Sequence, residues 1–149
     1  MKRQVRIERI KAVEREYLAA KAAIRLLEQR LHSNPTFGLN SRWRSKDARN
    51  LRNNLEDTFL IRFYAEFEAG LRDAWLLAFR RPTEPQMRDL LHAIATRCYI
   101  PHDWLDRVHD VREYRNALIH EGKENRTPIS IATARHYLCR FFSRLPADW

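Results

Sequence analysis

Residues 10–31 read IKAVEREYLAAKAAIRLLEQRL, and their apolar side chains recur with the spacing of a helix that buries one face. The members of this stripe are separated alternately by three and four positions: Ile10, Val13, Tyr17, Ala20, Ile24, Leu27 and Leu31. Such spacing places side chains on one side of an α-helix. The stretch therefore predicts a long first helix over residues 3–32, about 45 Å in length at the usual helical rise.

Outward from this stretch, apolar periodicity and helix punctuation predict four further helices. The second is expected to run from Ser45, its N-terminal cap, to residue 80 or 81, and the third from a capping box at residues 83–86 to about residue 99. The fourth starts near residue 103 and ends at Gly122, and Ser130 caps the fifth. We therefore predict an all-α fold: a single-domain bundle of four to five helices over residues 1–149, whose two long N-terminal helices form an antiparallel hairpin.

The net charge and the amino-acid composition indicate which kinds of binding partner to expect. The formal net charge is +9, and arginine supplies most of the 28 basic residues. Guanidinium groups match phosphate oxygens, so nucleic acid is the expected partner, although a genome rich in arginine codons would give the same excess. Cys98 and Cys139 predict neither a disulfide nor a metal site, and we expect no cofactor. With no long apolar run, we expect no signal peptide, no membrane partner and a cytoplasmic protein.

The fourth predicted helix carries an arginine within its apolar stripe. The stripe consists of Trp104, Val108, Val111, Arg115 and Leu118. An unpaired buried charge is unfavourable by several kcal/mol, so Arg115 either has a use there or reaches solvent from the edge of the stripe. The sequence leaves both interpretations open.

Arg115, Asn116 and His120 together offer the chemistry of metal-free RNA cleavage. Arginine stabilises negative charge on a phosphate, histidine transfers protons near neutral pH, and asparagine orients a neighbour. Residues five apart point about 140° apart around an ideal helix, so Arg115 and His120 do not share a face. A frayed last turn can bring them together, as can a second copy of the chain; we favour a homodimer that pairs two helix ends across a twofold axis.

Residues 115–120, RNALIH, resemble the R-x4-6-H signature of the HEPN superfamily, and residues 63–68 with Leu71 and Arg72 are similar to the second-helix pattern of several HEPN families. The resemblance implies a metal-independent endoribonuclease of the toxin or antiphage-defence kind, active as a dimer and leaving a 2′,3′-cyclic phosphate and a 5′-hydroxyl. It implies RNA as a partner, and an antitoxin or other inhibitor protein as a further one. Gly122 stands where toxins paired with a nucleotidyltransferase often have a tyrosine, so that particular antitoxin is not expected.

Other residues are candidates for supporting roles. Glu68 lies at the edge of an apolar face, where its carboxylate can pair with Arg115. A basic cluster with one tryptophan at the start of the second helix is predicted to bind RNA, or alternatively to be a solvated helix start with an anchoring ring: Arg42, Trp43, Arg44, Arg49 and Arg52. Surface or core roles are expected for His102, His109, His136 and Cys139.

Two other functions compete with cleavage. The first is a catalytically silent HEPN-like module that binds a nucleotide, RNA or a protein partner. The second is a coiled-coil adaptor built on the first helix, which explains the heptads but not the motif. The complete Arg-Asn-x-x-x-His set and the positive charge favour the ribonuclease.

Overall fold

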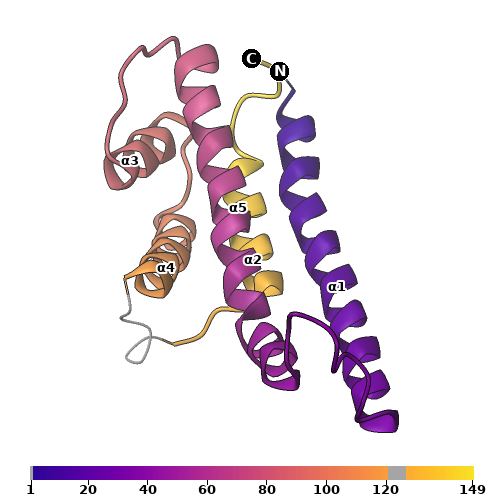
Figure 1. Cartoon of the computed structure of the whole chain (residues 1–149). Coiled ribbons are helices and arrows are strands. Elements are labelled where there is room, and N and C mark those ends of the chain that lie inside the picture. The colour runs from indigo at the N-terminus through magenta and orange to yellow at the C-terminus, as the bar shows by residue number, and fades with distance from the viewer. Residues whose placement is uncertain (1, 121–126) are drawn as a thin grey trace.

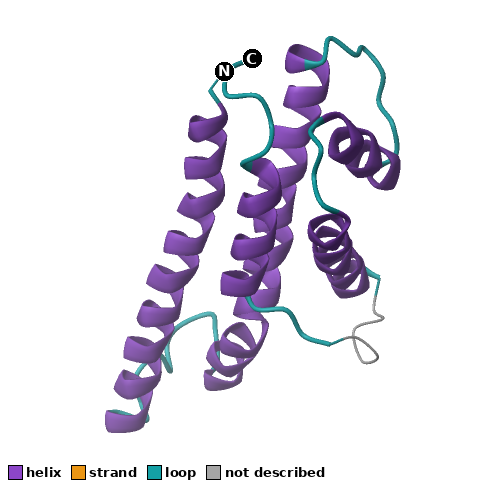
Figure 2. Cartoon of the chain, turned by 180° about the vertical axis from the view of Figure 1, so that it is seen from behind, coloured by secondary structure: helices purple, strands orange, loops and turns teal. Residues whose placement is uncertain are grey.

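The computed structural model describes residues 2–120 and 127–149, and it is built from helices joined by loops (Figure 1). The elements are α1 (Arg3–Ser33), α2 (Ser45–Asp73), η1 (Ala74–Ala78), α3 (Met87–Arg97), α4 (His102–Ile119) and α5 (Ile131–Phe142). No strand is present in the described residues (Figure 2), where an isolated bridge between Lys2 and Asp148 holds the two ends of the chain together. The predicted all-α fold is confirmed.

Helices α1 and α2 lie side by side and run in opposite directions (Figure 1). Three ion pairs join them, and the partner on α2 moves toward its N-terminus as the partner on α1 moves toward its C-terminus: Arg6–Asp73, Glu16–Arg62 and Glu28–Arg52. Only antiparallel helices give this order, so the predicted hairpin is confirmed. The Glu16–Arg62 and Glu28–Arg52 pairs are largely exposed to solvent and stabilise little, whereas the apolar stripe between the helices contributes more.

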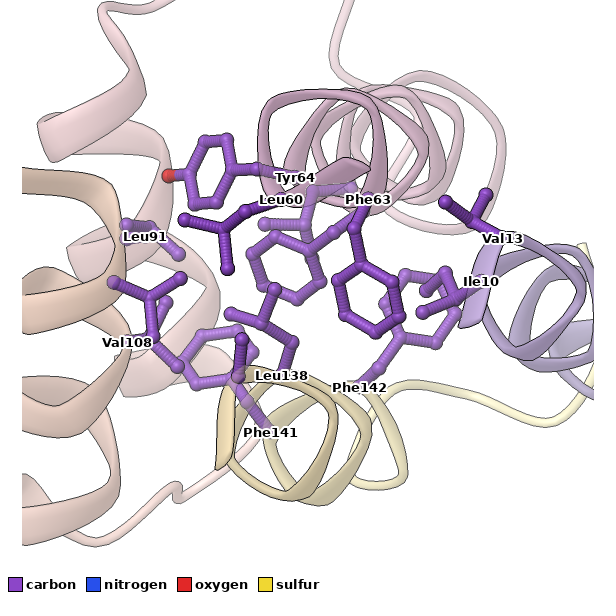
Figure 3. Close-up of a cluster of buried hydrophobic side chains, with 14 of the residues drawn as sticks. Ile10, Val13, Leu60, Phe63, Tyr64, Leu91, Val108, Leu138, Phe141 and Phe142 are labelled. Carbon is purple, nitrogen blue, oxygen red and sulfur yellow. The ribbon is translucent and has the colours of Figure 1, made fainter. Parts of the chain in front are cut away.

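The hydrophobic core lies where α2 meets α5, with α1 on one side and α3 and α4 on the other (Figure 3). The Phe67 ring contacts Phe141 and Phe142 edge-on, with centroid distances of 6.0 and 6.1 Å. Gly70 permits the close approach of α5, because a Cβ at this position would lie 2.8 Å from two ring carbons of Phe142. Any larger residue at position 70 must displace that ring.

The start of α2 differs from the prediction. Arg44 is the N-cap residue, and Ser45 is the first residue of the helix. The carboxylate of Asp47 accepts a 2.7 Å hydrogen bond from the backbone N–H of Arg44. Ser45 was the wrong choice of cap because a carboxylate in the first turn binds that donor and also interacts favourably with the helix dipole.

The C-terminal end of α2 changes from α-helical to π-helical geometry before the helical run ends. The helix was predicted to reach residue 80 or 81, but α geometry ends at Asp73 and continues as the π-helical η1. The N–H of Phe79 bonds the carbonyl of Ala74 five residues back, at 3.1 Å. Arg80 then adopts a left-handed φ of 52°, which ends the helical run ahead of Pro82.

The segment before α3 also differs from the prediction. Residues 83–86 were expected to open the helix as a capping box, but α3 begins after them. Thr83 Oγ1 instead accepts a 3.1 Å hydrogen bond from Trp75 Nε1, and the carbonyl of Pro85 accepts one of 3.3 Å from Arg72 Nη1. These two hydrogen bonds hold the segment against the end of α2 and η1. The Thr83 hydroxyl and the Pro85 carbonyl are therefore used in tertiary contacts and do not open the helix.

The predicted caps of α4 and α5 have different outcomes. His120 is the C-terminal cap residue of α4, and its N–H bonds the carbonyl of Asn116 at 3.0 Å. Gly122, the predicted cap, lies outside the described residues. Ser130 Oγ accepts a 3.1 Å hydrogen bond from the N–H of Thr133, which confirms the predicted cap of α5.

Candidate functional site

Arg115 lies at the boundary between the core and solvent. Its side chain is 25% exposed, and its guanidinium Cζ lies 5.4 Å from the centroid of the Tyr64 ring on α2. Arg115 Nη1 donates a 2.9 Å hydrogen bond to Asn116 Oδ1. Val108 and Val111, the preceding members of the predicted stripe, are fully buried. Arg115 therefore continues an apolar stripe, but it uses an aromatic face and an amide to remain charged at the edge of the core.

Glu68 lies close to Arg115, as expected from its place on α2. Glu68 Oε2 is 4.0 Å from Arg115 Nη2, a loose ion pair. The other carboxylate oxygen binds Arg72 more tightly, at 2.7 Å from Nη2 and 3.1 Å from Nε. The single carboxylate is thus shared between two arginines, and most of its hydrogen bonding goes to Arg72.

These side chains line an open pocket of about 320 Å³ between α2, α3 and α4. Four guanidinium groups and one carboxylate supply its charge: Arg72, Arg88, Arg112, Arg115 and Glu68. A concave site with such an excess of cations attracts anions, and arginine donors fit the oxygens of a phosphate or carboxylate. The pocket can therefore hold an anionic group against the predicted motif.

The other two motif residues take different positions. Asn116 lines the pocket, and its amide oxygen accepts the hydrogen bond from Arg115, so it helps to orient the guanidinium. His120 is exposed at the C-terminal end of α4 and is not among the described residues that line the pocket. Arg115 and Asn116 are thus brought together, whereas His120 is on the surface beside them.

The basic cluster at the start of α2 lies away from this pocket. Arg52 is about 18 Å from Tyr64 along the helix axis at the usual rise, and it pairs with Glu28 at 3.0 Å. Trp43 packs on the Phe37 ring, with centroids 6.4 Å apart, and one of its ring carbons would lie 2.8 Å from a Cβ at Gly38. The tryptophan therefore anchors the α1–α2 loop, while four arginines of the cluster are exposed, namely Arg42, Arg44, Arg49 and Arg52.

Sequence reasoning missed several residues of the pocket. Arg112 precedes Arg115 by three positions, so helical spacing alone could have placed it on a neighbouring part of the same face. Tyr64 lies in the segment 63–68 that carries the resemblance, but no role was predicted for it, and Arg88 carried no signal; both come from other helices than Arg115. Their approach to α4 depends on how α2, α3 and α4 pack together.

No family model matches the chain, and no curated protein or solved structure matches it either. None of the described helices combines the length and the apolar character that crossing a membrane requires.

Proposed function

We propose that this protein is a metal-independent endoribonuclease that acts on RNA as a homodimer. One observation carries the proposal: Arg115 and Asn116 meet at the wall of an open pocket that is lined by four guanidinium groups and one carboxylate. An RNA phosphodiester is an anion that such a pocket would bind, and its own 2′-hydroxyl supplies a nucleophile. The resemblance of residues 115–120 to the HEPN signature agrees with this reaction.

The proposed reaction is a transfer within the RNA chain. The 2′-oxygen forms a bond to phosphorus while the bond from phosphorus to the 5′-oxygen breaks. A base removes the 2′-hydroxyl proton and an acid protonates the departing 5′-oxygen, which leaves a 2′,3′-cyclic phosphate and a 5′-hydroxyl. Arg115 stabilises the charge that grows on the phosphoryl oxygens, His120 transfers a proton, and Asn116 holds the guanidinium in place.

The proposed mechanism needs Arg115 and His120 at the same phosphodiester, and a homodimer can supply both. His120 is exposed at the end of α4 and does not line the pocket that holds Arg115. A second copy related by a twofold axis can present its own exposed His120 to the pocket of the first. Each active site would then combine Arg115 of one protomer with His120 of the other.

The direct test is cleavage of RNA in the presence of EDTA. Arg115→Ala and His120→Ala should each lower the rate by about a hundredfold or more, with the helical circular dichroism unchanged. Arg9→Ala and His32→Ala, which change exposed residues of the same types on α1, serve as matched controls. Full activity in either motif variant would remove the corresponding residue from the mechanism. Toxicity on expression, relieved by His120→Ala, would support a role as a toxin or defence effector.

A catalytically silent module that binds RNA or a nucleotide is the second candidate. One observation favours it: His120 is not among the described residues that line the pocket holding Arg115 and Asn116. This module would bind RNA in an Arg115-dependent manner and leave it intact at every protein concentration. The ribonuclease would cut the same RNA.

A further inference from the structure

Two histidines meet across the contact between α3 and α4, beside the pocket. His92 Nε2 and His109 Nε2 lie 3.3 Å apart, and the ring centroids are 5.1 Å apart. Arg88 precedes His92 by four positions on α3, and Arg112 follows His109 by three on α4, so each histidine shares a helix face with an arginine of the pocket. The imidazole pair therefore lies along the same α3–α4 contact, about one helical turn from those arginines.

Four polar atoms around this face are buried without a hydrogen-bond partner in the described part of the chain: Tyr64 Oη, His109 Nδ1, Arg112 Nε and Arg115 Nε. Tyr64 is fully buried, and its hydroxyl points away from the neighbouring phenylalanine rings of the core (Figure 3). Burial raises the pKa of Tyr64 above its usual value, so the hydroxyl keeps its proton as a donor. Native proteins leave few buried polar groups unpaired, and a bound ligand accounts for several at once.

The charges of the surrounding side chains indicate whether that ligand is a cation or an anion. Two imidazole nitrogens 3.3 Å apart could ligate a transition metal, but no group of three or more His, Cys, Asp or Glu side chains suited to a metal occurs within residues 2–120 and 127–149. Arg88 and Arg112 would also repel a cation. Guanidinium and hydroxyl donors converge instead on an acceptor with several oxygens, and a tetrahedral phosphate has that form.

We propose that the pocket binds a phosphate group through Arg88, Arg112 and the Tyr64 hydroxyl. The His92–His109 pair lies beside this phosphate and takes up a proton as it binds. The inference deepens the proposed function and rests on it for the identity of the ligand as an RNA phosphodiester. Phosphate binding itself does not depend on cleavage.

In the protein without a bound anion, the surroundings of His109 favour its neutral form. Burial lowers the pKa of His109, and the charges of Arg112, His92 and Arg88 lower it further, while Glu113 on the same helix opposes them. His109 is therefore neutral at pH 7 when the pocket holds no anion. A phosphate would offset the arginine charges, raise the pKa of His109 and favour the imidazolium.

The test uses the full chain with inorganic phosphate as the probe. Calorimetry measures binding at constant ionic strength against sodium chloride, and NMR follows the histidine imidazoles across pH. We expect saturable binding, a rise in the pKa of His109, and proton uptake visible as a buffer-dependent heat. Arg112→Gln should weaken binding about tenfold and Tyr64→Phe about threefold. Arg107→Gln, on α4 but outside the pocket, is the matched control and should bind like the wild type.

Absence of saturable binding in the wild type would overturn the inference, as would unchanged affinity in both Arg112→Gln and Tyr64→Phe. Arg88→Gln changes an exposed side chain and gives a second reading if Arg112→Gln does not fold. A dinucleoside monophosphate that competes with phosphate identifies a diester site, and one that does not compete restricts the site to phosphate monoesters. Phosphate binding without any RNA cleavage would contradict the proposed function and support this inference. RNA cleavage without saturable phosphate binding would support the proposed function and contradict this inference.

Discussion

The guanidinium of Arg115 lies over the ring of Tyr64, with Cζ 5.4 Å from the ring centroid. A cation–π contact of this kind holds a guanidinium at the edge of the core and leaves N–H donors free for a ligand. Arg115 is thus neither sealed in the core nor extended into solvent, the two positions that its place in the stripe left open. It is a half-buried cation that lines a pocket.

Mixing two inactive variants tests whether the active site is shared between protomers. If Arg115 of one copy works with His120 of the other, a dimer of Arg115→Ala with His120→Ala retains one complete site. Random exchange at equal concentrations should then recover about a quarter of the wild-type sites. The measurement is RNA cleavage in EDTA by the mixture and by each variant alone.

A mixture as inactive as its components, with subunit exchange shown independently by mass spectrometry, would exclude the shared site. The wild-type protein must also be a dimer by sedimentation under the assay conditions. A monomer that cleaves RNA would place His120 and Arg115 of one chain in the same site.

Removal of the Tyr64 hydroxyl should stabilise the protein when phosphate is absent. The hydroxyl is buried and unpaired in the described structure, so Tyr64→Phe should raise the free energy of unfolding by about 1 kcal/mol. Tyr114 provides the matched control, since its hydroxyl donates a 3.1 Å hydrogen bond to Asp57, and Tyr114→Phe should lower the stability by about 1 kcal/mol. Urea unfolding measures both, and a loss of stability in Tyr64→Phe would show that its hydroxyl is paired.

A methyl group at Gly70 should loosen the contact between α2 and α5. Its carbon would lie 2.8 Å from the Phe142 ring, so Gly70→Ala should destabilise the fold by about 1–3 kcal/mol even though alanine favours helix. Phe142→Leu removes the clashing ring, and the double variant should lose less than the sum of the two single losses. Urea unfolding of the four proteins gives the coupling, and strictly additive losses would mean that the two sites do not touch.

Stability should fall at high pH because of a buried tyrosine. Burial, followed by the charge and hydrogen bond of Asp57, raises the pKa of Tyr114 to about 12, compared with about 10 in an unfolded chain. Because the folded pKa is the higher one, this contribution is complete below pH 10 and is lost as the pH rises toward 12. Tyr64, whose pKa is also raised, adds to the same decline.

The measurement is the free energy of unfolding in urea at several pH values between about 9 and 12. Tyr114→Phe should show a shallower decline than the wild type over this range. An identical slope in the two proteins would mean that Tyr114 has the same pKa folded and unfolded.

Much of the fold could be predicted because helix signals are local. The stripe of residues 10–31 predicted a helix over residues 3–32, and α1 spans Arg3–Ser33. Ser130 was recognised as a cap from its place before an apolar run, and it caps α5. The same local logic failed at Thr83, whose hydroxyl bonds Trp75, since a capping box and a tertiary hydrogen bond look alike in sequence.

In the candidate site, too, some features could be predicted from local sequence and others could not. That Arg115 and Asn116 lie together on α4, and that Glu68 stands at the edge of the apolar face of α2, follows from helical spacing alone. The meeting of His92 with His109 does not, because they are seventeen positions apart on different helices. Their contact depends on how α3 packs on α4, where Leu91 and Val108 enter the same side of the core (Figure 3).

By itself, the amino-acid sequence determined that the chain is helical, where several of its helices begin, and which faces are apolar, because each of these depends on residues within a few turns of one another. Only the tertiary structure decided that four arginines and a buried tyrosine line one pocket and that a pair of histidines meets beside it. Packing among α2, α3 and α4 set their positions, and the free energy of that packing comes from side chains distant in sequence.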